Sequence, residues 1–74
     1  MSYYLTVVYD GYNPDKDKEI EKVVGRESAG AGYGFGERDI QFEYKTKKAV
    51  ENASKRVNAA KLGVRTSVEE YEDL

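Results

Sequence analysis

Residues Ser28 to Tyr44 read SAGAGYGFGERDIQFEY, and this stretch decides the predicted fold. Glycine occupies every second position from Gly30 to Gly36, and apolar residues occupy every second position from Ile40 to Tyr44. A period of two indicates β-strands, although glycine weakens a strand and favours edges and bulges. We therefore expect a distorted edge strand in the glycine half, with a bulge or turn near Gly34 to Glu37. The stretch from Arg38 to Tyr44 predicts a strand with one buried face.

One strand and one helix are expected before this stretch. Tyr3 to Asp10 is rich in β-branched and aromatic residues and has apolar residues on both faces, which is typical of a central strand. Asn13 and Pro14 then provide an N-cap and a first helical residue. Ile20, Val23 and Val24 follow at helical spacing, and Gly25 is a suitable C-cap, so a helix of about 11 residues is predicted.

One helix and one strand are expected after it. Thr46 predicts the N-cap of a helix running to about Leu62, with Gly63 as its C-cap. The expected core stripe of this helix is Val50, Ala53, Val57 and Ala60. The last strand is expected over Val64 to Tyr71, with Val64, Thr66 and Val68 facing inward. The acidic residues at the end of the chain predict a solvated tail: Glu69, Glu70, Glu72 and Asp73.

The expected order is β-α-β-β-α-β. Two right-handed split βαβ units produce a ferredoxin-like α+β sandwich, with a four-stranded antiparallel sheet and two helices on one face. The 74 residues are enough for a single domain. This fold carries many unrelated functions, so the function has to come from particular residues.

The composition argues against several function classes. The chain has no histidine and no cysteine, so the commonest general base, the best nucleophile and the usual zinc ligands are missing. We expect neither enzymatic activity nor a metal or other cofactor. The start, MSYYLTVVYDGY, lacks the features of a signal peptide, and no apolar run is long enough to cross a bilayer. A cytoplasmic protein is therefore expected.

The glycine segment is the best candidate for a binding site. Tyr33 and Phe35 alternate with glycines that allow another backbone to approach, and an edge strand can accept a partner strand. Arg38 and Asp39 follow closely and offer directional contacts. The predicted function is therefore a small, acidic protein-binding module, such as an inhibitor or accessory factor of the kind that phages and mobile elements encode. The alternative for Tyr33 and Phe35 is that they fill the core.

Two further functions remain open. Gly32-Tyr33-Gly34-Phe35 resembles the middle of the signature of the RNA-recognition motif, a family in which aromatic residues stack on bases. The resemblance implies binding of RNA or single-stranded DNA. However, the formal charge of -2 gives no basic surplus for phosphate contacts. The other alternative is a homodimer formed through an edge strand.

The start of the second helix is a candidate anion site. Lys47 and Lys48 occupy its first turn, where positive charge opposes the helix dipole. Lysines together with free N–H groups predict a weak anion-binding site. The alternative is a surface ion network with Asp10, Asp15 and Asp17, which the sandwich is expected to bring to the same end.

Overall fold

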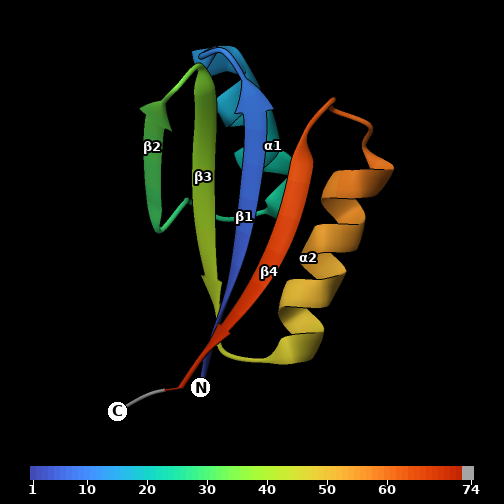
Figure 1. Cartoon of the computed structure of the whole chain (residues 1–74). Helices are drawn as coiled ribbons and strands as arrows, with labels where there is room; N and C mark the ends of the chain where they lie inside the picture. The colour runs from blue at the N-terminus through green and yellow to red at the C-terminus, as the bar shows by residue number, and fades with distance from the viewer. Residues whose placement is uncertain (73–74) are drawn as a thin grey trace.

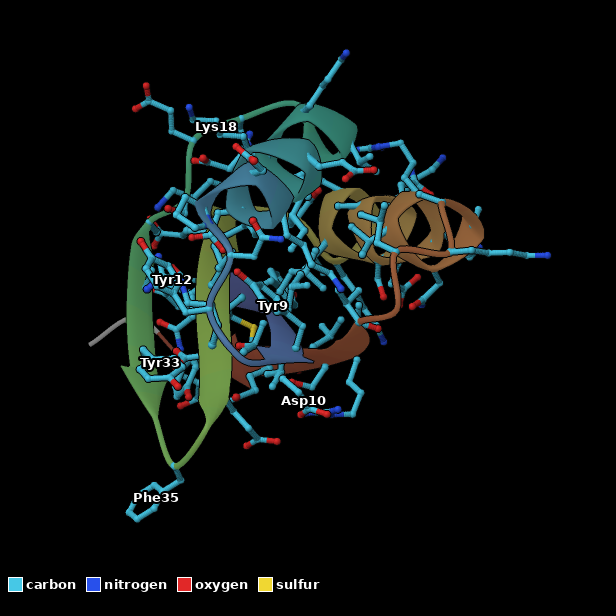
Figure 2. The ribbon with its side chains drawn as sticks, turned by 90° about the horizontal axis from the view of Figure 1, so that it is seen from above. Tyr9, Asp10, Tyr12, Lys18, Tyr33 and Phe35 are labelled. Carbon is cyan, nitrogen blue, oxygen red and sulfur yellow. The ribbon has the colours of Figure 1, made fainter. Side chains whose placement is uncertain are left out.

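The computed structural model describes residues 1–72, which form one sheet and two helices. The elements in chain order are β1 (Ser2–Asp10), α1 (Pro14–Val24), β2 (Gly30–Gly34), β3 (Glu37–Tyr44), α2 (Lys47–Ala59) and β4 (Arg65–Tyr71). The strands are antiparallel in the order β2-β3-β1-β4 (Figure 1). Both helices lie on one side of the sheet (Figure 2). The predicted ferredoxin-like α+β sandwich is confirmed, with β1 as a central strand.

The glycine stretch forms a tight hairpin at the sheet edge. β2 pairs with β3 from Gly30, opposite Gln41, to Gly34, opposite Glu37. The two turn residues, Phe35 and Gly36, both have positive φ, at 52° and 78°. Positive φ at both central positions defines a type I′ turn, whose twist matches that of the flanking strands. The predicted edge strand and turn are confirmed, and β3 begins one residue earlier than expected.

The ends of α1 are capped as the sequence predicts. The Asn13 side-chain oxygen accepts hydrogen bonds from the backbone N–H groups of Asp15, at 3.0 Å, and Lys16, at 3.4 Å. Gly25 ends the helix in the left-handed conformation and donates its N–H to the Glu21 carbonyl oxygen at 2.8 Å. These contacts satisfy backbone groups that a short helix leaves free. Ile20 and Val24 are buried, as the apolar stripe indicates.

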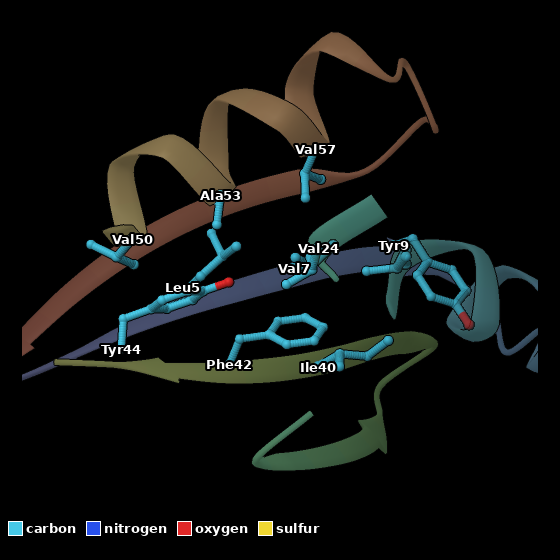
Figure 3. Packing of buried hydrophobic residues seen from close by; sticks show 11 residues of the cluster. Leu5, Val7, Tyr9, Val24, Ile40, Phe42, Tyr44, Val50, Ala53 and Val57 are labelled. Atoms are coloured by element: carbon cyan, nitrogen blue, oxygen red, sulfur yellow. The ribbon is translucent and has the colours of Figure 1, made fainter. Parts of the chain in front are cut away.

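The core lies between the helices and the covered face of the sheet (Figure 3). Its buried members are Leu5, Val7 and Tyr9 of β1, Ile20 and Val24 of α1, Ile40, Phe42 and Tyr44 of β3, and Val50, Ala53 and Val57 of α2. The alternating residues of β1 and β3 thus face the core as the period of two predicts. β2 contributes none of these buried residues.

The end of α2 differs from the prediction. Thr46 caps the helix by accepting from the Ala49 N–H at 3.2 Å, but the helix ends at Ala59 and Ala60 is exposed. Leu62 lies five residues beyond Val57, so a continued helix would carry it off the core stripe. Ending earlier lets the chain turn back, and Leu62 packs partly buried against the core. Gly63 belongs to the connecting loop and is not the helix cap.

The last strand begins at Arg65, one residue later than predicted. Val68 lies opposite the buried Leu5, so it faces the helices as predicted, but it remains an exposed hydrophobic residue. β4 is an outer strand with a neighbour on one side only, so its side chains are covered less than those of β1. Glu69 and Glu70 of the expected acidic tail lie within β4, and Asp73 lies outside the described residues.

The two ends of the sheet carry different features. Ser2 pairs with Tyr71, so the start of β1 and the end of β4 lie at the same end of the sheet (Figure 1). Asp10 pairs with Glu37 at the opposite end, next to the hairpin turn and the loop that leads into α1.

Candidate protein-binding surface

Three exposed aromatic residues gather at the hairpin end of the molecule, and we call them the aromatic surface: Tyr12, Tyr33 and Phe35. Tyr33 is 58% exposed and Phe35 is 108% exposed. The alternative that Tyr33 and Phe35 fill the core is therefore wrong. Figure 2 shows Phe35 projecting from the hairpin tip, away from the rest of the protein.

The backbone of Phe35 is unusual for an aromatic residue. Its φ of 52° lies in the left-handed region, where a residue with a Cβ is destabilised by roughly 1–2 kcal/mol. Asparagine, aspartate and glycine are the residues that type I′ turns favour. The turn is also held in place, because the Gly11 N–H donates to the Gly36 carbonyl oxygen at 2.7 Å. Phe35 is thus presented to solvent by an anchored turn at a conformational cost.

Tyr12 and Tyr33 form a pair beside the hairpin. Their ring centroids are 6.0 Å apart and the ring planes are inclined by 47°. The Arg38 guanidinium lies 4.7 Å from the centre of the Tyr12 ring, a cation–π contact. Arg38 is directly opposite Tyr33 across the hairpin, so β3 places its side chain on the same face of the sheet. The Tyr12 ring therefore rests on a charged group, and the Tyr33 ring lies against Tyr12.

Arg38 is itself held by α1. Its Nη2 and Nε atoms donate to the same oxygen of Asp17, at 2.9 Å and 3.1 Å, and only 19% and 14% of the two side chains are exposed. The hydrogen bonds to Asp17 raise the pKa of Arg38. The Tyr9 hydroxyl also contacts Asp17 and lies 2.9 Å from the Asn13 carbonyl oxygen. Burial, and then the bond to Asp17, raises the pKa of Tyr9. This network ties β1, α1 and β3 together beneath the aromatic surface.

Asp39 lies on the other side of the sheet. Consecutive residues of a strand point to opposite faces, so Arg38 faces the helices and Asp39 faces the uncovered side. Asp39 is directly opposite Gly32, and a Cβ at that glycine would come within 3.1 Å of the Asp39 Oδ1 atom. Among the four predicted binding residues, Tyr33 and Arg38 therefore lie opposite each other on one face, Phe35 lies at the adjoining turn, and Asp39 lies on the other face. A binding role for any of them stays a prediction.

Lys47 and Lys48 are far from the aromatic surface. They open α2 just after Tyr44, and Tyr44 pairs with Tyr3 at the end of the sheet opposite Asp10. The expected ion network with Asp10, Asp15 and Asp17 is therefore wrong, because the helix starts at the other end. Neither lysine forms a salt bridge within residues 1–72. Anion binding by the two lysines stays a prediction.

The uncovered face of the sheet is acidic along β3. Glu37, Asp39 and Glu43 are the charged residues of β3 on this face, while Arg65 of β4 pairs with Glu37 at 2.6 Å and with Asp10 at 3.2 Å. The segment resembling the RNA-recognition signature lies in β2 and its turn, whereas the family resemblance implies the third strand. Carboxylates along this face disfavour a nucleic-acid backbone.

Comparison of the chain with protein-family models, curated proteins and solved structures found no significant match. Within residues 1–72, no helix is long and apolar enough to cross a membrane. The same residues contain no group of three histidine, cysteine, aspartate or glutamate side chains placed to hold a metal ion.

Sequence reasoning missed two members of the site. Tyr12 lies in the loop between β1 and α1, and no periodic pattern includes it. Its position between the end of a predicted strand and a predicted helix cap is the one available signal of an exposed aromatic residue. Asp17 was expected in an ion network with Lys47 and Lys48, and its pairing with Arg38 instead depends on how α1 crosses the sheet.

Proposed function

We propose that the protein is a non-enzymatic binding module that recognises another protein through the aromatic surface and the adjacent edge of β2. Exposed tyrosine and phenylalanine side chains are enriched at protein interfaces, where they bury a large area at low entropic cost. Tyr12 is positioned by Arg38 and pairs with Tyr33, which reduces the ordering required when a partner binds. An inhibitor or accessory factor is the specific role that we propose.

The observation that carries this proposal is the conformation of Phe35. A side chain fully in solvent contributes nothing to the core, and its left-handed backbone destabilises the turn. Strain of this kind concentrates at functional sites, and an observed outlier supports a hypothesis of function. A partner pocket that takes the phenyl ring provides a physical reason for the residue.

A capture experiment tests the proposal. The protein is immobilised and exposed to lysate with and without nuclease, and the wild type is compared with a Phe35→Asn/Tyr33→Thr double variant. Arg38 is left unchanged because its pairing with Asp17 supports the fold. The matched control is Tyr71→Ala, since Tyr71 is 52% exposed but lies at the other end of the sheet.

We expect a nuclease-resistant partner that the double variant loses and the Tyr71→Ala variant retains. Affinity for this partner should depend weakly on salt, whereas nucleic-acid binding weakens steeply as salt rises. Retention of every partner by the double variant would overturn the proposal. A nuclease-sensitive partner lost at low salt would replace it with single-stranded nucleic-acid binding.

A further inference from the structure

The outer edge of β2 has backbone groups that point away from the sheet. In a hairpin closed by a two-residue type I′ turn, the two residues that flank the turn form two backbone hydrogen bonds with each other. Along the strands, such bonded pairs then alternate with pairs that form no hydrogen bonds with each other. Gly34, Gly32 and Gly30 therefore bond with β3. Ala31 and Tyr33 therefore direct their N–H and C=O groups outward. β2 is an outer strand of the sheet, so another strand can pair with these groups (Figure 1).

This edge lacks the usual protection against pairing. Natural edge strands carry charged side chains, proline or bulges that keep other strands away. β4, the other outer strand, carries Arg65, Glu69 and Glu70. β2 consists of the five residues GAGYG, which include neither a charged side chain nor a proline. The difference between the two edges indicates that β2 is the one suited to receive a strand.

The sequence of β2 is complementary to itself in the antiparallel direction. When two copies pair about a two-fold axis at Gly32, Ala31 of each lies opposite Tyr33 of the other. These are the residues whose backbone groups point outward, so both pairs close with two hydrogen bonds. The small alanine faces the large tyrosine, and Gly30 faces Gly34. The close central pair consists of two glycines, which have no side chains to collide.

Such pairing also covers exposed aromatic area. The two-fold axis is perpendicular to the sheet, so the helices of both copies remain on the same side. Tyr33 lies on this side, and Tyr12 lies beside it with its ring 6.0 Å away. Across the new pair of strands, the two Tyr12–Tyr33 pairs become neighbours. Burial of these rings stabilises the association in addition to the backbone hydrogen bonds.

We propose that two copies of the free protein join through β2 in this register and form a continuous antiparallel sheet. The inference rests on the proposed function, because it names a second copy as an occupant of the same binding edge. A different partner that uses the β2 edge must then displace the second copy. Binding of that partner and dimerisation are therefore mutually exclusive.

Engineered disulfides test the register. The natural chain has no cysteine, so each single substitution introduces one thiol. Opposite residues in a non-hydrogen-bonded antiparallel pair have Cα atoms roughly 4.5 Å apart, within the range that a disulfide bridges. Gly32→Cys places the two thiols in such a pair at the centre of the interface. The three atoms nearest to a Cβ there belong to the carboxyl group of Asp39, the end of a side chain that can shift, so we expect the substitution to preserve the fold.

Gly30→Cys and Gly34→Cys are the matched controls on the same strand and face. A Cβ at Gly34 meets nothing within 4 Å, and at Gly30 it is 3.8 Å from the Gln41 side chain. In the proposed register each of these thiols lies roughly 13 Å from its own counterpart. Neither variant should cross-link alone. A mixture of the two should cross-link, because position 30 faces position 34 of the second copy.

A proline variant tests the backbone bonds. The Ala31 N–H points outward, and proline is tolerated in an edge strand where its missing N–H faces solvent. Ala31→Pro should leave the monomer folded by circular dichroism and weaken the dimer by about tenfold or more, since each copy loses a donor. Ala31→Thr keeps the N–H and should dimerise like the wild type. Sedimentation equilibrium over a wide concentration range measures both.

We expect a concentration-dependent doubling of mass, cross-linking by Gly32→Cys alone and by the Gly30→Cys/Gly34→Cys mixture, and loss of the central cross-link when Ala31→Pro is added. A monomeric mass throughout, or equal cross-linking at positions 30, 32 and 34, would overturn the dimer. The proposed function fails separately: if the Phe35→Asn/Tyr33→Thr variant still captures every partner, that function is wrong whether or not the dimer forms.

Discussion

At the scale of single residues, Phe35 is proposed to contribute to binding although it destabilises the fold. Phe35→Asn should stabilise the protein by about 1 kcal/mol, because asparagine tolerates the left-handed region that the turn requires. Denaturant unfolding measures the change. Phe35→Ala is the control, since it removes the ring and keeps the Cβ penalty, so it should not gain stability. Equal stabilisation by both variants would assign the effect to the exposed ring instead of the backbone.

Two buried tyrosine hydroxyls differ in their partners, which predicts opposite effects of removing them. The Tyr44 hydroxyl is buried and makes no hydrogen bond with any of the described residues, so Tyr44→Phe should be neutral or stabilising by up to about 1 kcal/mol. The Tyr9 hydroxyl contacts Asp17 and Asn13, so Tyr9→Phe should destabilise by about 1–3 kcal/mol. Denaturant unfolding of the two variants tests the contrast, and a larger loss from Tyr44→Phe would contradict it.

At the scale of elements, α2 approaches the sheet through a small residue. Ala53 is fully buried and points toward Leu5 (Figure 3). Ala53→Leu should destabilise by about 1–3 kcal/mol, because the added methylene and methyl groups push the helix from β1. Ala59→Leu on the exposed part of the same helix should have little effect. Thermal unfolding of both variants measures the difference, and similar melting temperatures would place Ala53 outside the tight contact.

The elements themselves were largely predictable because local rules determine them. Caps at Asn13 and Thr46, the period of two in β1 and β3, and the glycine-rich turn all depend on residues close in sequence. The predicted end of α2 near Leu62 was wrong because Leu62 packs against the core, and this contact depends on tertiary structure. The contacts of Arg38 with Tyr12 and Asp17 were not predicted because they also depend on tertiary structure. They join β3 to a loop and to α1.

At the scale of the whole molecule, stability should fall in alkaline solution. Burial raises the pKa of both Tyr9 and Tyr44 above the ordinary value of 10.0. Below that value both the folded and the unfolded chain keep these protons, so the two tyrosines make their full contribution to the free energy of unfolding. As pH rises above it, the unfolded chain releases protons that the folded chain retains, so the free energy of unfolding decreases. Each tyrosine contributes at most about 1.4 kcal/mol per pH unit.

Denaturant unfolding between pH 8 and pH 11, roughly spanning the tyrosine range, measures this decline. A Tyr9→Phe/Tyr44→Phe variant should show a shallower decrease with pH than the wild type. The comparison uses slopes, so the different starting stability of the variant does not affect it. Identical slopes would show that other groups determine the alkaline response.

The pairing of Ser2 with Tyr71 has a practical consequence for how the molecule is handled. Both strand ends lie at the end of the sheet remote from Phe35, across roughly 27 Å of β-ladder. A fluorophore, a tether or a fused reporter attached at the start of β1 therefore stands clear of the hairpin. Coupled to a sensor chip in this way, the protein directs its hairpin into the flowing solution, and immobilisation and recognition do not compete for the same surface.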